Sequence, residues 1–273
     1  MLTPKRPIAF ILASSNHGTM IVNRNDYCMV GENRGYGVGF QILNSSSFDP
    51  TEINFAMALL NCRRRHFGDG VIAIDGGANI GVHTLEWARL MHEWGEVIGF
   101  EAQEIVFYAL AGNIAINNCL NARVKLAALG EVCGELAIPQ PNYLKPSSFG
   151  SLEIRQSATN EFIGQTISYD DNAMNKVPMI SIDSLNLLRL DFLKIDVEGM
   201  EIEVLKGAKE TLNRCKPIML IEVIKSDRLE LENFAFQYGY KLFSMGINLL
   251  AIHETDPTLQ QINVVNNQIT LTL

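Results

Sequence analysis

The sequence predicts an α/β fold built on a doubly wound, mostly parallel sheet. Apolar runs at 71–74 and 97–100 have the length of strands and lack the polar alternation of a half-exposed sheet, which indicates strands covered on both faces. Segments with apolar residues at helical spacing follow these runs, at 82–91 and 104–118. Alternating strands and helices form parallel sheets with right-handed crossovers. We therefore expect ligands to bind beyond the carboxyl ends of the strands.

The chain of 273 residues, 47% of them hydrophobic, is long enough for one large domain with a sizeable core. We expect residues 1–66 to form short strands and turns and one helix packed on the core, and residues 67–273 to form the main domain. Within that domain, prolines, serines and asparagines interrupt the pattern at about 139–178. Long irregular loops in compact domains are usually functional or disordered, so we expect a substrate-side insertion there.

The composition disfavours several classes of protein. A formal net charge of −8 opposes nonspecific binding to nucleic acid. The dense basic run Arg63–Arg65 follows a predicted helix, where cations complement the helix dipole. No apolar stretch reaches the about 18 residues of a membrane span. Five cysteines without a C-x-x-C pair disfavour a zinc site and indicate a reducing compartment, so we expect a cytoplasmic protein.

The segment 71–84 reads as a strand, a glycine-rich turn and a helix. Gly77 and Gly81 let a ligand or a helix approach the backbone closely, and the turn directs the free N–H groups of the helix toward the ligand. A dinucleotide-binding turn reads G-x-G-x-x-G, with an acid about 20 residues downstream for the ribose. Here Asp75 precedes the turn and Asn79 lies within it. An acid before the turn is unfavourable beside a pyrophosphate but favourable beside an ammonium group.

The second apolar run ends at Glu101, where the next parallel strand should finish. A carboxylate at that position can accept both hydroxyls of a ribose. The alternative is that the glycines only serve a strand-to-helix turn, but acids at the ends of two successive strands favour a ligand site. The pattern predicts a pocket for an adenosine with an amino-acid tail, and the cofactor-binding residues that we expect are Asp75, Gly77, Asn79, Gly81 and Glu101.

Three segments resemble the FkbM-type family of S-adenosylmethionine (SAM)-dependent methyltransferases. They are IDGGANIGVHT at 74–84, GFE at 99–101, and SIDSL with DFLKIDVEGMEIEVLKGA within 181–208, the last being the most specific. The resemblance covers about 67–223. It departs from the family where proline often follows the ribose acid, because Ala102 comes next here.

The resemblance implies the class I SAM-dependent methyltransferase fold with an antiparallel C-terminal strand. It also implies SAM as cofactor and methyl transfer to an oxygen of a sugar or other small natural-product acceptor. One alternative is a protein of the same fold that binds SAM or a nucleotide without catalysis. A nicotinamide oxidoreductase is disfavoured by Asn79 and by the acid before the turn. The sequence identifies neither the acceptor nor the oligomeric state.

Methyl transfer to a hydroxyl requires alignment of the oxygen and a base that removes its proton. Asp196 and Glu198 follow a predicted strand at the cofactor edge of the sheet, although acids there also cap helices. Glu222 ends another apolar strand, and His83 lies in the first turn after the glycines, where it is as often an ordinary helix residue. We expect Asp196 to be the base, with Glu198, Glu222 and His83 as the other candidates. Three acids do not establish a metal site, and we assign none.

Overall fold

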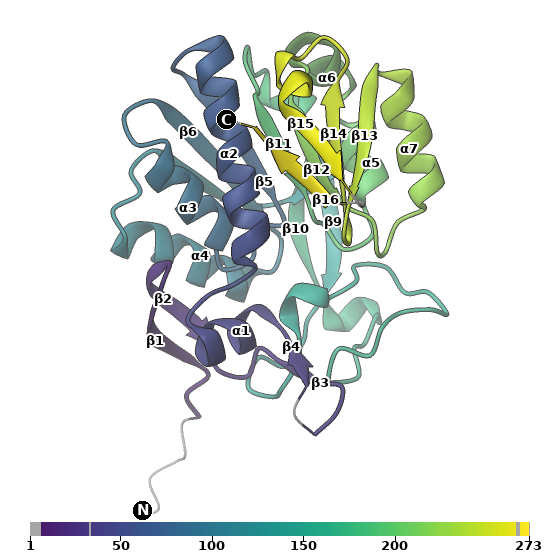
Figure 1. The fold of residues 1–273 in the computed structure, drawn as a ribbon. Helices are drawn as coiled ribbons and strands as arrows, with labels where there is room; N and C mark the ends of the chain where they lie inside the picture. Colours follow the sequence, from purple (N-terminus) through teal and green to yellow (C-terminus); the bar gives the residue numbers. More distant parts are fainter. Residues whose placement is uncertain (1–6, 33, 266–267, 273) are drawn as a thin grey trace, which may run out of the picture.

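The computed structural model describes residues 7–32, 34–265 and 268–272. A seven-stranded sheet forms its centre (Figure 1). Its strands in chain order are β5 (Val71–Gly76), β6 (Gly95–Glu101), β7 (Ala122–Leu126), β11 (Phe192–Ile195), β12 (Ile218–Glu222), β13 (Tyr240–Met245) and β14 (Asn248–His253). Their order in space is β13-β14-β12-β11-β5-β6-β7. Strands β5, β6, β7, β11 and β12 pair in parallel, whereas β14 is antiparallel to both of its neighbours. The sheet is therefore of the class I SAM-dependent methyltransferase type, and its antiparallel C-terminal strand is confirmed.

Helices cover both faces of the sheet. They are α2 (Pro50–Phe67), α3 (Val82–Leu90), α4 (Glu104–Ile116), α5 (Glu201–Lys206), α6 (Lys209–Cys215) and α7 (Arg228–Gln237). Side chains of α2, α3 and α4 share one core with Phe192 and Ile218, and those of α5, α6 and α7 share another with Leu193 and Met219. Successive strand residues thus enter opposite cores, which explains the unbroken apolar runs.

Met200, Val204, Ala208 and Leu212 have the spacing of one continuous helix, but the structure divides this stretch into α5 and α6. The interruption falls at Gly207, where a Cβ would lie 2.2 Å from the carbonyl oxygen of Gly130. Only glycine lets the two backbones approach this closely, so packing requires a glycine at the point where the helical pattern is interrupted.

The N-terminal part contains the short strands that the sequence predicts, and one additional helix. The strands are β1 (Phe10–Ser15), β2 (Gly18–Asn23), β3 (Cys28–Met29) and β4 (Gly35–Tyr36). Helix α1 (Val38–Ser45) forms where only strands and turns were expected. Val38 and Ile42 are buried in a third core with Phe149, so tertiary packing stabilises a helix that the local sequence does not indicate. Figure 1 shows this part beneath the main sheet.

The segment 139–178 is less irregular than expected. Its last residues belong to β10 (Met174–Ile180), which pairs with β9 (Gly134–Pro139) and β8 (Ala128–Leu129). The preceding stretch is joined to the N-terminal part by Asp26, whose carboxylate accepts the N–H groups of Gly39 and Phe149 at 2.8 and 2.9 Å. Burial raises the pKa of Asp26 to about 6, although these hydrogen bonds oppose the rise.

A C-terminal hairpin, β15 (Ile262–Val265) and β16 (Gln268–Leu271), was not expected from the sequence. Among the described residues, no helix is both long and apolar enough to cross a membrane. The five cysteines all carry free thiols.

The basic run at the end of α2 divides into one buried and two exposed side chains. Arg63 is only 5% exposed, and its guanidinium group forms ion pairs with Asp191, at 3.2 Å, and with Asp256. Arg64 and Arg65 are exposed in the last turn, as the helix-dipole interpretation requires. The Arg63 cluster therefore joins α2 to residues far along the chain.

We predict that Arg63→Ala lowers the free energy of unfolding by about 3–5 kcal/mol, because it leaves the buried carboxylate of Asp256 without its cation and removes one of the two arginines paired with Asp191. Urea denaturation followed by circular dichroism measures the change. The neighbouring variant Arg65→Ala is the control and should change the free energy by less than about 0.5 kcal/mol. Equal stabilities of the two variants would contradict a structural role for the Arg63 cluster.

Candidate functional site

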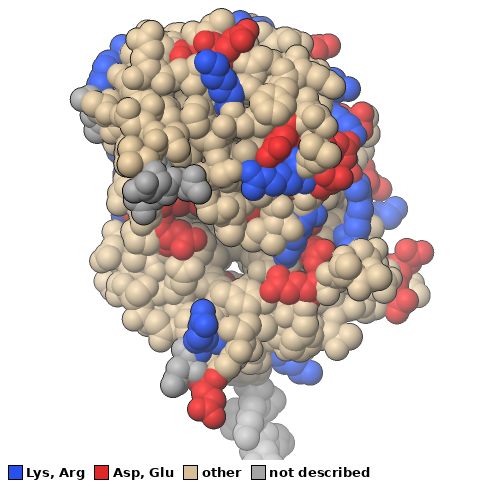
Figure 2. Space-filling model, turned by 45° about the vertical axis from the view of Figure 1, so that its right-hand side comes forward, with Lys and Arg blue, Asp and Glu red and all other residues tan. Residues whose placement is uncertain are grey.

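A cavity of about 430 Å³ lies beyond the carboxyl ends of the parallel strands. This is the edge at which doubly wound sheets bind ligands, and the volume is within the usual range for small-molecule sites. Its wall combines the β5–α3 turn, the ends of β6, β11 and β12, the N-terminal part and the 148–161 stretch. Figure 2 shows a hollow between the upper and lower halves of the molecule, with charged side chains around it.

The β5–α3 turn is fixed by a close backbone contact. Gly77 has φ of 77°, and a Cβ there would lie 1.7 Å from the carbonyl oxygen of Asp196. The N–H of Gly77 donates to the carbonyl of Phe100 at 3.0 Å, and the N–H of Asn79 donates to the carboxylate of Glu101 at 2.9 Å. Both hydrogen bonds attach the turn to the end of β6, and the contact at Gly77 places it against the residue that follows β11. Gly77 and Asn79 line the cavity.

Glu101 is buried at the end of β6, with 7% exposed. One carboxylate oxygen accepts the N–H of Asn79, and the other accepts the N–H of Gln103 at 2.8 Å. Burial raises the pKa of Glu101 to about 7, although these hydrogen bonds oppose the rise. Each oxygen has a second lone pair, so the side chain can hold the turn and still accept hydroxyl groups from a ligand. Gln103, which sequence reasoning missed, also donates from its side chain to the carbonyl of Phe149 at 2.8 Å.

Asp75 and Gly81 lie behind the turn and do not line the cavity. The Asp75 carboxylate is 1% exposed and accepts a hydrogen bond from the hydroxyl of Thr84 at 2.6 Å. At Gly81, a Cβ would lie 2.5 Å from the side chain of Leu110. In this structure the two residues support the turn and its packing on α4, and any ammonium group in the cavity needs another carboxylate.

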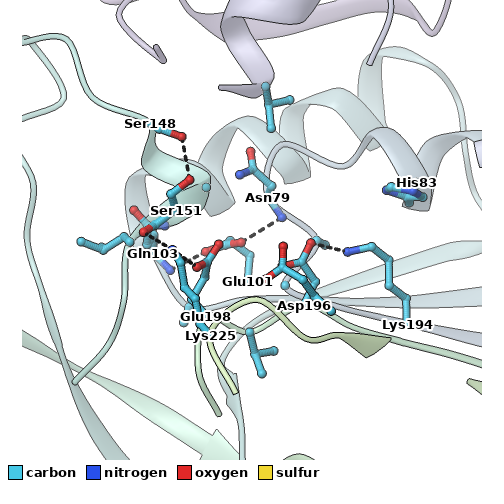
Figure 3. A pocket seen from close by; sticks show the side chains of 18 of the residues that line it. Asn79, His83, Glu101, Gln103, Ser148, Ser151, Lys194, Asp196, Glu198 and Lys225 are labelled. Atoms are coloured by element: carbon cyan, nitrogen blue, oxygen red, sulfur yellow. Dashed lines mark hydrogen bonds and ion pairs between the residues drawn. The ribbon is translucent and has the colours of Figure 1, made fainter. Parts of the chain in front are cut away.

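Three of the candidate catalytic residues lie together. One carboxylate oxygen from each of Asp196, Glu198 and Glu222 is within 4.8 Å of the other two. The ammonium group of Lys194 donates to Asp196 at 2.7 Å, and that of Lys225 lies 2.6 Å from Glu198 (Figure 3). The cluster therefore holds three acids and two amines, so two of the carboxylates already have cationic partners.

Burial and crowding alter the acidity of this cluster. Burial, followed by the negative charge of Asp196, raises the pKa of Glu222 to about 8. The same causes raise the pKa of Glu198, against the opposing charge of Lys225. Burial alone would lower the pKa of Lys194, but the carboxylates around it, with Asp196 the strongest, hold it above the ordinary value. Glu222 therefore retains a proton near neutral pH, while Lys194 stays charged.

His83, the fourth candidate, lies at another part of the cavity wall. It is 7% exposed, and its Nε2 is 3.1 Å from a carboxylate oxygen of Glu52 at the start of α2. The second oxygen of Glu52 accepts the side-chain amide of Asn248 at 2.5 Å. Sequence reasoning missed Glu52, Asn248, Lys194 and Lys225. Only Lys194 had a recognisable signal, because a lysine inside the apolar run of a buried strand needs a charged partner.

Comparisons with known proteins identify the family. The family model described as the methyltransferase FkbM domain matches residues 75–242, which is more than half of the chain. The chain belongs to the FkbM methyltransferase family. The cofactor of the domain is SAM, as the resemblance of the glycine turn and the DVEG segment implied.

Two curated relatives are methyltransferases from fungi. Methyltransferase sdnD of Sordaria araneosa is 28% identical over 156 residues, which cover 50% of this chain and 60% of that protein. Methyltransferase 1 of Beauveria bassiana is 26% identical over 156 residues, which cover 52% of this chain and 59% of that protein. The chain thus spans about three fifths of the length of these relatives. Among solved structures, methyltransferase FkbM from Methylobacillus flagellatus is 18% identical, with a TM-score of 0.48 over 68% of this chain and 44% of that chain.

The cavity of this FkbM domain has the chemistry that SAM requires. Glu101 offers carboxylate oxygens to a ribose at the end of the second strand. Next to it, Phe100 and the run 127–129 provide an apolar surface for an adenine ring. Charged groups of both signs, among them Glu52, Lys194 and Asp196, also line the wall, as an amino-acid tail needs. The residues present therefore fit the cofactor.

We predict that Glu101→Gln weakens the binding of S-adenosylhomocysteine, the demethylated cofactor, by about 10- to 100-fold, because a charge-assisted contact to the ribose is lost. Isothermal titration at about pH 8, above the raised pKa of Glu101, measures the affinity. A circular dichroism spectrum that matches the wild type excludes misfolding. Unchanged affinity would contradict the assignment of Glu101 to the ribose.

The raised pKa of Glu222 also predicts how stability depends on pH. From the ordinary value of 4.5 up to about 8, the folded protein binds this proton more tightly than the unfolded chain does. The stabilisation is present below the lower value and is lost as pH rises through the upper one. We predict that the free energy of unfolding falls less steeply with pH in Glu222→Gln than in the wild type. Urea denaturation between about pH 5 and 8 tests this, with the exposed variant Glu96→Gln expected to keep the wild-type slope.

Proposed function

We propose that the protein transfers the methyl group of SAM to a hydroxyl oxygen of a sugar or another small natural-product acceptor. When bound, SAM supplies a methyl group on a sulfonium, which is a good leaving group. The observation that carries the proposal is the acid cluster beside the glycine turn, since the backbone of Asp196 packs directly on Gly77. A group that removes a proton there would lie next to the cofactor.

In this proposal the carboxylate of Asp196 takes the proton of the acceptor hydroxyl as the oxygen bonds to the methyl carbon. Lys194 holds one oxygen of this carboxylate at 2.7 Å, which keeps the side chain oriented. The Asp196 side chain is 33% exposed, so an acceptor can reach it. Glu198, Glu222 and His83 remain the other candidates for the base. A hydroxyl oxygen held in line behind the methyl carbon needs no further covalent chemistry from the protein.

The wall of the cavity supports a neutral acceptor with several hydroxyl groups. Carboxylates outnumber amines on it, which disfavours an anionic acceptor through like-charge repulsion. Ser151 and Glu161 contribute polar groups from the 139–178 segment, and we assign them to the acceptor. Two wall residues, Ile224 and Ile247, are 57% and 52% exposed and offer apolar contact to the body of an amphipathic acceptor.

The function is tested by binding followed by turnover. Isothermal titration with SAM and S-adenosylhomocysteine tests whether the cavity takes the cofactor. Release of S-adenosylhomocysteine from SAM is then measured with a panel of sugars, glycosides and hydroxylated polyketides. Turnover of a hydroxylated acceptor supports the proposal. Binding without turnover of any acceptor favours the non-catalytic alternative, and failure to bind either form of the cofactor overturns the enzyme hypothesis.

For an acceptor found in that panel, we predict that Asp196→Asn lowers kcat by about 10²–10⁴-fold, the usual cost of losing a general base. The affinity for S-adenosylhomocysteine should change little, because Asn keeps the shape of the side chain. Rates are measured at saturating acceptor, with the exposed variant Glu96→Gln as control. Near-normal kcat in Asp196→Asn would exclude Asp196 and direct attention to Glu222.

A further inference from the structure

One end of the cavity is built by residues outside the segment that matches the family. Asp49 and Glu52 at the start of α2, and Asn248 in β14, lie before and after residues 75–242. All three line the cavity, together with His83 and Lys194. This end therefore combines two carboxylates with an ammonium group and an imidazole.

Asp49 occupies the N-cap position of α2 but does not cap the helix. Its φ of 31° is left-handed, and its carboxylate accepts no hydrogen bond from the first turn, although aspartate is a favoured capping residue. The side chain lines the cavity instead. Burial, and then the charge of Glu52 one turn along the helix, raises the pKa of Asp49. Two acids thus face the same space, and a bound cation there would relieve their repulsion.

Glu52 is the more strongly ionised of the two acids. Burial opposes ionisation, but the contact with His83 and the charge of Lys194 lower the pKa of Glu52 below its ordinary value. Asn248 fixes the carboxylate by donating to it at 2.5 Å. The result is an oriented, charged carboxylate on the cavity wall, with 17% of its side chain exposed.

The opposite end of the cavity is the one suited to the ribose. In Figure 3, His83 and Lys194 lie on one side, and Gln103 and Ser148 lie on the other, with Asp196 between them. Glu101 contacts Gln103. An extended ligand whose ribose lies at Glu101 and whose sulfur lies near Asp196 would therefore direct its amino-acid tail toward His83 and Lys194.

We propose that Glu52 and Asp49 bind the ammonium group of the methionine tail of SAM, and that Lys194 and His83 bind its carboxylate. A zwitterion is recognised by paired opposite charges, and the N-terminus of α3, at the base of this end, adds a positive dipole for the carboxylate. Asp75, the acid nearest the turn in sequence, lies behind the wall and leaves the ammonium to these residues. The proposal rests on the assignment of SAM as the cofactor.

Two ligands distinguish binding of the amino-acid tail from binding of the rest of the cofactor. S-adenosylhomocysteine carries the amino-acid tail, whereas 5′-methylthioadenosine has the same adenosine and sulfur without it. Isothermal titration of both ligands is carried out on the wild type and on Glu52→Gln, which keeps the shape and can still accept from Asn248. We expect Glu52→Gln to lower the affinity for S-adenosylhomocysteine by about 10- to 100-fold, which corresponds to the loss of a charged hydrogen bond. The affinity for 5′-methylthioadenosine should stay within about twofold, because that ligand lacks the ammonium group.

Glu101→Gln is the matched comparison variant. Because it loses a contact to the ribose, which both ligands carry, its affinity for both ligands should fall alike. Retained binding of 5′-methylthioadenosine also demonstrates that Glu52→Gln is folded. If Glu52→Gln binds S-adenosylhomocysteine as the wild type does, this end does not hold the tail and the proposal is overturned. Equal loss for both ligands overturns it as well, because Glu52 would then act through the fold. If the wild type binds neither ligand, the cofactor assignment itself fails, which is a distinguishable result.

Discussion

The structure depends on one close approach between two backbones at the edge of the sheet. No side chain fits between Gly77 and the carbonyl of Asp196, where a Cβ would lie 1.7 Å from the oxygen. The ends of β5 and β11 can therefore touch, and this contact brings the glycine turn beside the acid cluster. Glu101 completes the arrangement from the third strand, since it accepts the N–H of Asn79. The geometry of the site is thus a consequence of sheet packing, without any need for a flexible loop.

Burying several carboxylates at this edge is electrostatically unfavourable, and two different arrangements reduce this cost. Asp196, Glu198 and Glu52 have cationic or imidazole partners within 3.1 Å. Glu222 has none of these contacts, and burial beside Asp196 raises its pKa to about 8. For Glu52, the contact with His83 and the charge of Lys194 hold the pKa below its ordinary value, whereas burial and crowding keep a proton on Glu222 near neutral pH. One small cavity thereby holds carboxyl groups in both protonation states.

Much of the fold could be predicted from the sequence because its signals are local. The apolar run of β5, the glycines and Glu101 lie within about one βαβ unit, and their spacing is sufficient to place them at the same edge. Features set by distant contacts could not be predicted. Helix α1 forms because Val38 and Ile42 pack against Phe149, and β10 forms because β8 and β9 pair with it. No local sequence pattern indicates either contact.

The same distinction holds within the site. The candidate acids were recognised because each follows an apolar strand, but their partners are contributed by other elements. Glu52 is near the start of α2 and Asn248 is 196 residues later, yet their side chains are hydrogen-bonded. Conversely, Asp75 has the expected position in sequence, but its side chain turns to Thr84 behind the wall. The direction of a side chain at a strand end depends on the helices packed around it. The sequence pattern of the strand carries no information about that packing.

The segment that defines the family is consequently not a complete structural unit. Residues 75–242 contain neither α2, whose Leu59 and Leu60 are fully buried in the main core, nor β14, the neighbour of β12 in the sheet. Arg63 from α2 also neutralises Asp191 inside the matched segment. Because the flanking elements are required to close the core, side chains on them lie at the cavity at no additional folding cost.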